Sequence, residues 1–313
     1  MKKALLILNP RAGQRRANRF LADIIRLFCE NGYRTEVYVT GQGGDATRYL
    51  AAQPADSLDL VVCAGGDGTL NETIAGLLHA GLRCPIGYIP CGSTNDYAAS
   101  IGLSGDVMQA ARDIMEGQPH CLDIGTFNGR YFVYTATCGA FARTSYTTSQ
   151  AAKNVLGHLA YVFEGVKDLA SIRPIHLKVE TENQSIEDDF LLCSVTNSTS
   201  VGGILRLDSQ LVALDDGRFE VTLVRNPVTP QQLSTVLYGL TTQDVPNEMI
   251  YFFSAQHITF TGTAPVEWTV DGERADETDR VTLENLNGKV AIIIPNVRQV
   301  PVITAPPLDE AEE

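Results

Sequence analysis

The chain has 313 residues, of which 44% are hydrophobic and 19% are charged, and a formal net charge of −13. This length allows two domains with sizeable cores, and the negative charge argues against nucleic acid as a partner because its phosphates would be repelled. Seven scattered cysteines and five separated histidines lack zinc-ligand spacing, and no apolar run is long enough for a bilayer span or a secretion signal. We therefore expect a cytoplasmic protein with reduced thiols.

Residues 1–125 alternate between strand-like and helix-like patterns. The segment at 58–65, LDLVVCAG, carries a continuous apolar run, as the strands of parallel sheets do. Strands are expected at residues 3–10, 33–40, 58–65 and 85–90, and helices at residues 17–28, 45–52, 70–78 and 106–117. The alternation predicts an α/β domain with a doubly wound parallel sheet.

Residues 126–300 consist mostly of short segments with alternating apolar and polar residues, which indicate antiparallel strands. Strands are expected at residues 130–137, 175–181, 189–195, 218–224, 250–255, 257–262, 266–272 and 289–294. Helices at about 151–171 and 230–241 interrupt them. We expect a mainly antiparallel β-sandwich or barrel-like second domain. The acidic residues 301–313 are expected to form a disordered tail, with the option that part of it returns to the N-terminal domain.

Three polar loops follow expected parallel strands: NPRAG at 9–13, GGDGT at 65–69 and PCGSTNDYA at 90–98. Ligands of open α/β sheets collect at the carboxyl ends of the strands, so three such loops at one edge predict a binding site. Known phosphate-binding motifs of other kinds, such as the P-loop, the dinucleotide fingerprint and the protein-kinase set, are absent.

The GGDGT loop has the chemistry of a phosphate site. Gly65, Gly66 and Gly68 leave backbone amides accessible, and a helix beginning near Thr69 points its positive end at the same place. Asp67 would repel a phosphate unless a Mg²⁺ ion lies between the two. The alternative is that Asp67 only caps the helix.

At this point the chain resembles the diacylglycerol kinase catalytic-domain family of lipid kinases, which includes bacterial diacylglycerol kinases and sphingosine kinases. The three loops stand in family order and spacing. They are followed by LGHLAY (156–161), TNSTSVGG (196–203), LDDGRFEV (214–221) and VDGE (270–273). GGDGT alone also occurs in NAD kinases and phosphofructokinases, so the later motifs make the resemblance specific.

The resemblance implies an N-terminal nucleotide domain, a C-terminal β-sandwich, and a cleft between them for ATP and lipid. Glu273 matches the general base, and Asp67 is the second catalytic residue. The implied ATP contacts are Asn9, Gly13, Thr40, Gly65, Gly66, Asp67, Gly68, Thr69, Asn71, Glu72 and Ser93. VDGE also allows a plainer interpretation, because Asp271-Gly272 is a strong hairpin signal, and such a turn would aim Glu273 into the cleft.

The resemblance further implies a structural Mg²⁺ held by Asp216 and the backbone carbonyls of Ala213 and Arg218, although LDDG is equally compatible with an ordinary Asp-Gly turn. Two positions depart from the family pattern. Ser93 stands where threonine is usual, and Ala99 stands where arginine is frequent. A nearby basic group, Arg11, Arg15 and Arg16, offers a replacement cation.

The expected function is an ATP- and Mg²⁺-dependent lipid kinase that phosphorylates a hydroxyl of a diacylglycerol-like lipid. Such an enzyme would visit the inner face of the membrane transiently. Two alternatives stay open: a kinase of a soluble molecule such as NAD, and a nucleotide-binding regulator without turnover. An exposed strand edge in the second domain also leaves a homodimer open.

Overall fold

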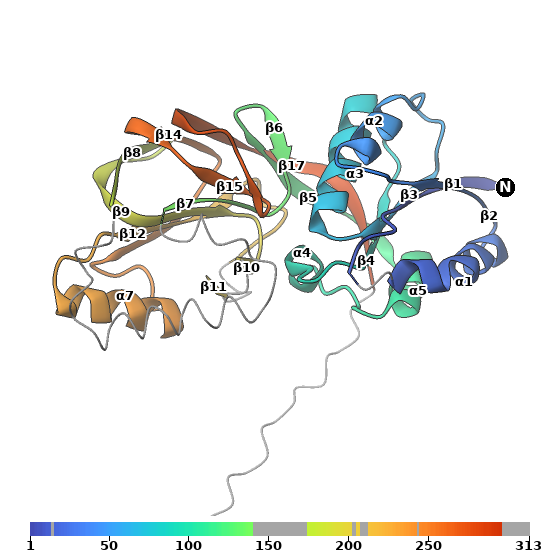
Figure 1. Ribbon diagram of the computed structural model, residues 1–313, viewed down its shortest axis with the longest axis horizontal. Coiled ribbons are helices and arrows are strands. Elements are labelled where there is room, and N and C mark those ends of the chain that lie inside the picture. The colour runs from blue at the N-terminus through green and yellow to red at the C-terminus, as the bar shows by residue number, and fades with distance from the viewer. Residues whose placement is uncertain (14–15, 140–173, 202–204, 207–211, 243, 296–313) are drawn as a thin grey trace, which may run out of the picture.

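The computed structural model describes residues 1–13, 16–139, 174–201, 205–206, 212–242 and 244–295 (Figure 1). The helix expected at 151–171, the motif at 156–161 and the tail at 301–313 lie outside the described residues, as does part of the motif at 196–203. One hydrogen-bonded sheet of 15 strands runs through the described residues, parallel at one end and mainly antiparallel at the other.

The parallel segment of the sheet runs in the order β2–β1–β3–β4. Its strands are β1 (Lys2–Leu8), β2 (Tyr33–Val39), β3 (Leu60–Gly65) and β4 (Ile86–Pro90). Every residue of β3 and β4 is buried. Burial on both faces explains why these strands read as continuous apolar runs in the sequence.

Helices cover both faces of the parallel segment, as Figure 1 shows. One face packs against α1 (Arg16–Glu30) and α5 (Val107–Glu116). The other packs against α2 (Asp45–Ala51), α3 (Asp67–Ala80) and the short α4 (Asp96–Ser100). The predicted α/β character of the N-terminal part is thus confirmed. In the described part of the chain, no helix combines the length and the apolar character required to cross a bilayer.

The remaining described residues are mostly antiparallel strand, as predicted. Its strands are β5 (Gln118–Phe127), β6 (Arg130–Phe132), β7 (Thr135–Gly139), β8 (Ile175–Thr181), β9 (Ser185–Thr196), β12 (Phe219–Arg225), β13 (Ile250–Ala255), β14 (His257–Val266), β15 (Trp268–Val270), β16 (Glu273–Arg274) and β17 (Thr278–Ile294). The strands β10 (Ser200–Val201) and β11 (Leu205–Arg206) form a separate pair. Trp268 lies at the centre of the core, edge-on to Phe127 and Phe260, and α7 (Pro230–Thr242) packs on a smaller cluster.

Two long strands, β5 and β17, connect the two parts of the molecule and lie side by side (Figure 1). The first half of β17 pairs with β14, while its end reaches the parallel segment, where Ile292 is the register partner of Ile86 in β4. Val290 and Ile293 are buried in the two cores of the α/β part. Residues 290–294, which the sequence pattern groups with the second domain, therefore pack with the first.

Candidate active site

The loops at the carboxyl ends of β1, β3 and β4 converge at one edge of the parallel segment. A Cβ atom built on Gly92 would lie 2.8 Å from the Cα of Gly66. Gly13 has a φ of +51°, and a Cβ there would meet the carbonyl oxygen of Cys91 at 2.2 Å. Such approaches require glycine, so the glycine-bearing loops singled out in the sequence meet in the structure.

Side chains of these loops are also linked to one another. Asn9 Nδ2 donates to Thr69 Oγ1 at 2.9 Å, which joins the loop after β1 to the start of α3. Asn9 Oδ1 accepts the amide of Arg11 at 3.0 Å and so fixes the same loop. Thr40 is buried at the end of β2, and Ser93 is exposed in the loop between β4 and α4.

The N-terminus of α3 is open. Its cap residue is Gly66, in an extended conformation, and it makes no side-chain capping hydrogen bond. A glycine cap leaves first-turn amides available, and the positive end of the helix faces the loop edge. Asp67 lies in the first turn and does not fill the capping role. Gly65 is required beneath it, because a Cβ there would lie 2.5 Å from the Cβ of Thr69.

Asp67 lies in an acidic environment and is partly shielded from solvent. Burial, followed by the charges of Asp96 and Asp271, raises the pKa of Asp67 to about 7, although a 3.4 Å hydrogen bond from Tyr88 Oη opposes the shift. Carboxylates that raise one another's pKa favour a cation between them. The oxygen donors at Asp67 therefore fit Mg²⁺, which binds proteins through one or two carboxylates and takes further ligands from phosphates and water. Within the described residues, no three His, Cys, Asp or Glu side chains could hold a metal unaided.

The hairpin of β15 and β16 brings Glu273 to this edge. Asp271 and Gly272 form its two-residue turn with φ values of +49° and +80°, which confirms the predicted turn. Glu273 Oε1 lies 3.7 Å from the position that a Cβ on Gly68 would occupy. Glu273 Oε2 lies 3.3 Å from an Nη atom of Arg130, and the Glu273 side chain is 65% exposed. A carboxylate open to solvent thus stands beside the start of α3.

Asp271 is the residue that sequence reasoning missed. Its carboxylate is buried and accepts the amides of Val133, Tyr134 and Thr135 at 2.7, 3.0 and 3.1 Å. It also accepts Nδ2 of Asn71, from α3, at 2.5 Å. Burial raises the pKa of Asp271, while these four donors oppose the rise. Asp271 therefore fixes the hairpin, and with it Glu273, relative to the helix that carries Asp67. The sequence did not reveal this role, because the Asp-Gly turn already explained why an aspartate stands there.

Glu72 points toward the neighbouring helix. Its two carboxylate oxygens accept the amides of Gly44 and Ala46 at 2.8 and 3.3 Å, and its carbonyl oxygen accepts the hydroxyl of Thr47 at 2.9 Å. The side chain therefore satisfies the N-terminal amides of α2 and holds the loop that follows β2. Two backbone amides therefore already occupy the Glu72 carboxylate.

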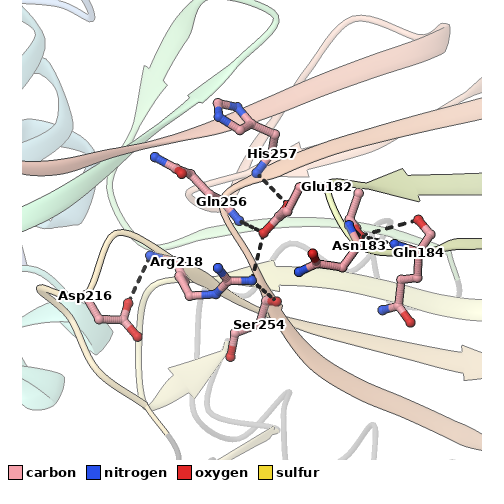
Figure 2. Close-up of polar contacts among 9 residues, drawn as sticks. Glu182, Asn183, Gln184, Asp216, Arg218, Ser254, Gln256 and His257 are labelled. Atoms are coloured by element: carbon pink, nitrogen blue, oxygen red, sulfur yellow. Dashed lines mark hydrogen bonds and ion pairs between the residues drawn. The ribbon is translucent and has the colours of Figure 1, made fainter.

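The predicted second metal site lies on the loop before β12. Gly217 has a φ of +78°, and Asp216 Oδ1 accepts the amide of Arg218 at 2.9 Å, so an Asp-Gly turn is present. Figure 2 shows the Arg218 side chain directed away from Asp216. Its guanidinium contacts Glu182 at 2.7 Å and the carbonyl oxygen of Ser254 at 2.8 Å. Arg218 thereby anchors the loop to the adjoining strands.

Two buried carboxylates face this loop. Asp123 accepts the amide of Gly217 at 2.6 Å. Glu220 accepts the amide of Ala213, yet its Oε2 atom is buried and has no hydrogen-bond partner among the described residues. Burial, with the nearby charges of Asp216 and Asp123, raises the pKa of Glu220 to about 8. The loop thus concentrates negative charge that a cation would neutralise, and one buried oxygen has no donor in the described part of the chain.

Comparison with known proteins agrees with this architecture. The profile of the diacylglycerol kinase catalytic domain matches residues 3–127, and that of the YegS C-terminal NAD kinase beta sandwich-like domain matches residues 135–294. A diacylglycerol kinase of Bacillus subtilis (strain 168) is 31% identical over 274 residues, covering 87% of this chain and 90% of the relative. One of Staphylococcus saprophyticus is 29% identical over 295 residues, covering 94% and 96%.

Solved structures are similar over the same length. A crystal structure described as a diacylglycerol kinase from Bacillus anthracis strain Sterne has a TM-score of 0.75 and 25% identity, covering 94% of this chain and 97% of its own. A second structure from the same strain, at 23% identity, has a TM-score of 0.71 and shares the fold. The motifs, the two profiles and the relatives agree: the chain belongs to the diacylglycerol kinase catalytic-domain family and is a kinase-type enzyme.

Proposed function

We propose that the protein is a lipid kinase that uses ATP and Mg²⁺ to phosphorylate a hydroxyl of a diacylglycerol-like lipid. The observation that carries this proposal is the position of Glu273, whose Oε1 lies 3.7 Å from a Cβ built on Gly68 at the open start of α3. Phosphoryl transfer depends on positioning and electrostatic stabilisation, and this arrangement supplies an anion-binding helix end beside an exposed carboxylate. The relatives named diacylglycerol kinase support the lipid as substrate.

The nucleotide would occupy the loop edge. The first-turn amides of α3 and the loop at residues 65–69 would bind its phosphates, while Asn9, Gly13, Thr40 and Ser93 would line the remainder. Asn71 would act indirectly, by fixing Asp271, and Glu72 by holding the loop after β2. Asp67 would hold a Mg²⁺ ion, which neutralises phosphate charge when it is bound.

The reaction then follows from the position of the two carboxylates. The oxygen of the lipid hydroxyl forms a bond with the γ-phosphorus of ATP while the bond from that phosphorus to the oxygen of ADP breaks. Glu273 accepts the hydroxyl proton and releases it to solvent, which its 65% exposure allows. We assign Asp67 no part in this proton transfer, and it stays with the phosphates.

Several finer features belong to the same proposal. A membrane lipid as substrate requires transient contact with a bilayer surface. We propose a β-sandwich for the second part, in line with the family profile that covers residues 135–294. The unpartnered Glu220 oxygen supports a cation at the loop of Ala213, Asp216 and Arg218. Pairing of two copies stays a prediction.

Turnover of ATP against a substrate panel tests the proposal. Diacylglycerol, monoacylglycerol, sphingosine, phosphatidylglycerol and NAD would each be incubated with Mg²⁺ and γ-labelled ATP, and transfer of label measured. We expect label in a lipid and none in NAD. Label in NAD alone would replace the proposal with a soluble-substrate kinase. Nucleotide binding without transfer to any acceptor would favour the regulator.

A further inference from the structure

The ion pair between Arg130 and Glu273 contributes little to the stability of the fold. The two side chains are 63% and 65% exposed, and their charged atoms are 3.3 Å apart. Ion pairs this open to water and salt are weak. The position of Arg130 therefore matters more for what its guanidinium can reach than for holding the hairpin in place.

The backbone that carries Arg130 is firmly held beside α3. It follows a tight turn at Asn128 and Gly129, whose φ values are +48° and +82°. The Asn128 side chain accepts the amide of Thr282 in β17 at 2.8 Å. The residue after Arg130 is Tyr131, and its carbonyl oxygen accepts a hydrogen bond from Asn71 Nδ2 at 3.4 Å. The Arg130 side chain thus extends from a well-anchored stretch of backbone next to α3, the helix whose N-terminus forms the candidate phosphate site.

Arg130 pairs with one carboxylate of an acidic group. Burial raises the pKa of the Tyr134 hydroxyl, and so do the charges of four nearby carboxylates: Asp271, Asp67, Asp96 and Glu273. A bound nucleotide would bring more negative charge to the same edge. A guanidinium is well suited to such a place because its N–H groups form paired hydrogen bonds with phosphate oxygens.

We propose that Arg130 binds the terminal phosphate of ATP, an inference that rests on the proposed function. A general base must lie within about 2.6–3.2 Å of the hydroxyl whose proton it takes. That hydroxyl must in turn approach the terminal phosphorus to about 3–3.5 Å. The terminal phosphate consequently lies next to Glu273, and Arg130 already contacts the Glu273 carboxylate at 3.3 Å.

This placement makes Arg130 change partner during the reaction cycle. In the free protein its guanidinium pairs with Glu273. With ATP bound, the terminal phosphate takes the guanidinium, and Glu273 is released to accept the substrate hydroxyl. ADP has no terminal phosphate of this kind, so the original ion pair persists. Arg130 therefore distinguishes ATP from ADP.

Calorimetric titration of the full chain with Mg²⁺ and either ADP or a non-hydrolysable ATP analogue tests the inference. The variants are Arg130→Met and Arg130→Lys, with Arg274→Met as the matched control. Arg274 is 66% exposed, belongs to the same hairpin as Glu273, and pairs with Glu267 and Glu277 instead. Its loss reproduces the change in net charge without touching the proposed contact.

We expect Arg130→Met to weaken binding of the ATP analogue about tenfold more than binding of ADP, which is typical for loss of a charged hydrogen bond. Arg130→Lys should fall between, and Arg274→Met should leave the ratio of the two affinities unchanged. An Arg130→Met protein with the wild-type ratio would overturn this inference while leaving the proposed function intact. A wild-type protein that binds neither nucleotide would overturn both.

Discussion

The two carboxylates assigned to the candidate site, Asp67 and Glu273, have opposite environments. Asp67 is half-buried in the first turn of α3, and burial together with two acidic neighbours raises its pKa to about 7. Glu273 is 65% exposed, directly follows a two-residue turn and is paired with a guanidinium. A partly buried carboxylate beside the first-turn amides of α3 is suited to binding a cation and phosphate, whereas a solvent-exposed carboxylate can exchange a proton with water. The same functional group thus acquires two roles from its surroundings.

Removal of the partly buried Asp67 carboxylate should have the largest effect on turnover. We expect Asp67→Ala to reduce turnover to background, because the phosphates would lose the group that holds their Mg²⁺. Asp67→Asn, which keeps the shape, should do the same. Kinase assays measure the effect, and Asp59→Asn is the control, since Asp59 lies just before the other end of β3 and is exposed. Turnover near wild type in either Asp67 variant would remove Asp67 from the mechanism.

Removal of the exposed carboxylate should slow the reaction without disturbing the nucleotide. Glu273→Gln keeps the shape but cannot take a proton, so kcat should fall by about 10²–10⁴, while the Kd for ATP changes little. Glu277→Gln is the matched control, because Glu277 is 52% exposed and pairs with Arg274. A Glu273→Gln enzyme within a few-fold of wild-type turnover, or one that fails to fold, would reduce Glu273 to a turn residue.

The contact that joins the Glu273 hairpin to the helix carrying Asp67 can be weakened separately. Asn71→Ala removes the 2.5 Å hydrogen bond to Asp271 and leaves a buried carboxylate oxygen with one donor fewer. We expect a loss of about 1–3 kcal/mol in the free energy of unfolding, measured by urea titration. Asn183→Ala, at an exposed turn, should cost far less. If the two variants are equally stable, Asp271 does not link the hairpin to α3.

Sequence patterns predicted one side of the site better than the other. The loop edge was predictable because strand, glycine and helix follow one another locally, and the carboxyl ends of parallel strands must meet. The role of Asp271 was not, because its partner Asn71 is 200 residues away and the Asp-Gly turn already accounted for the residue. Arg130 gave no signal for the same reason. The helix α4 was expected to be loop, and it forms because Tyr97 and Ala98 are buried in the core.

An effect confined to part of the pH range concerns the stability of the nucleotide-free protein. Burial and the charges of Asp96 and Asp271 raise the pKa of Asp67 from 3.8 to about 7. Stability from the protonated group is therefore fully present below about pH 4 and is lost as the pH rises through about 7. Asp67→Asn cannot ionise, so it should match wild type at pH 4 and exceed it at pH 8 by about 1–3 kcal/mol, after allowance for water at a half-buried group.

Thermal unfolding of both proteins across this pH range, with and without Mg²⁺ and ADP, measures that difference. A cation held at Asp67 stabilises its ionised form, so Mg²⁺ with ADP should raise the Tm of wild type more than that of Asp67→Asn. Asp59→Asn serves again as the control, because Asp59 is exposed and lies near the other end of β3. A stability difference between wild type and Asp67→Asn that stays constant from pH 4 to pH 8 would contradict the raised pKa, and with it the contrast between the partly dry and the exposed carboxylate.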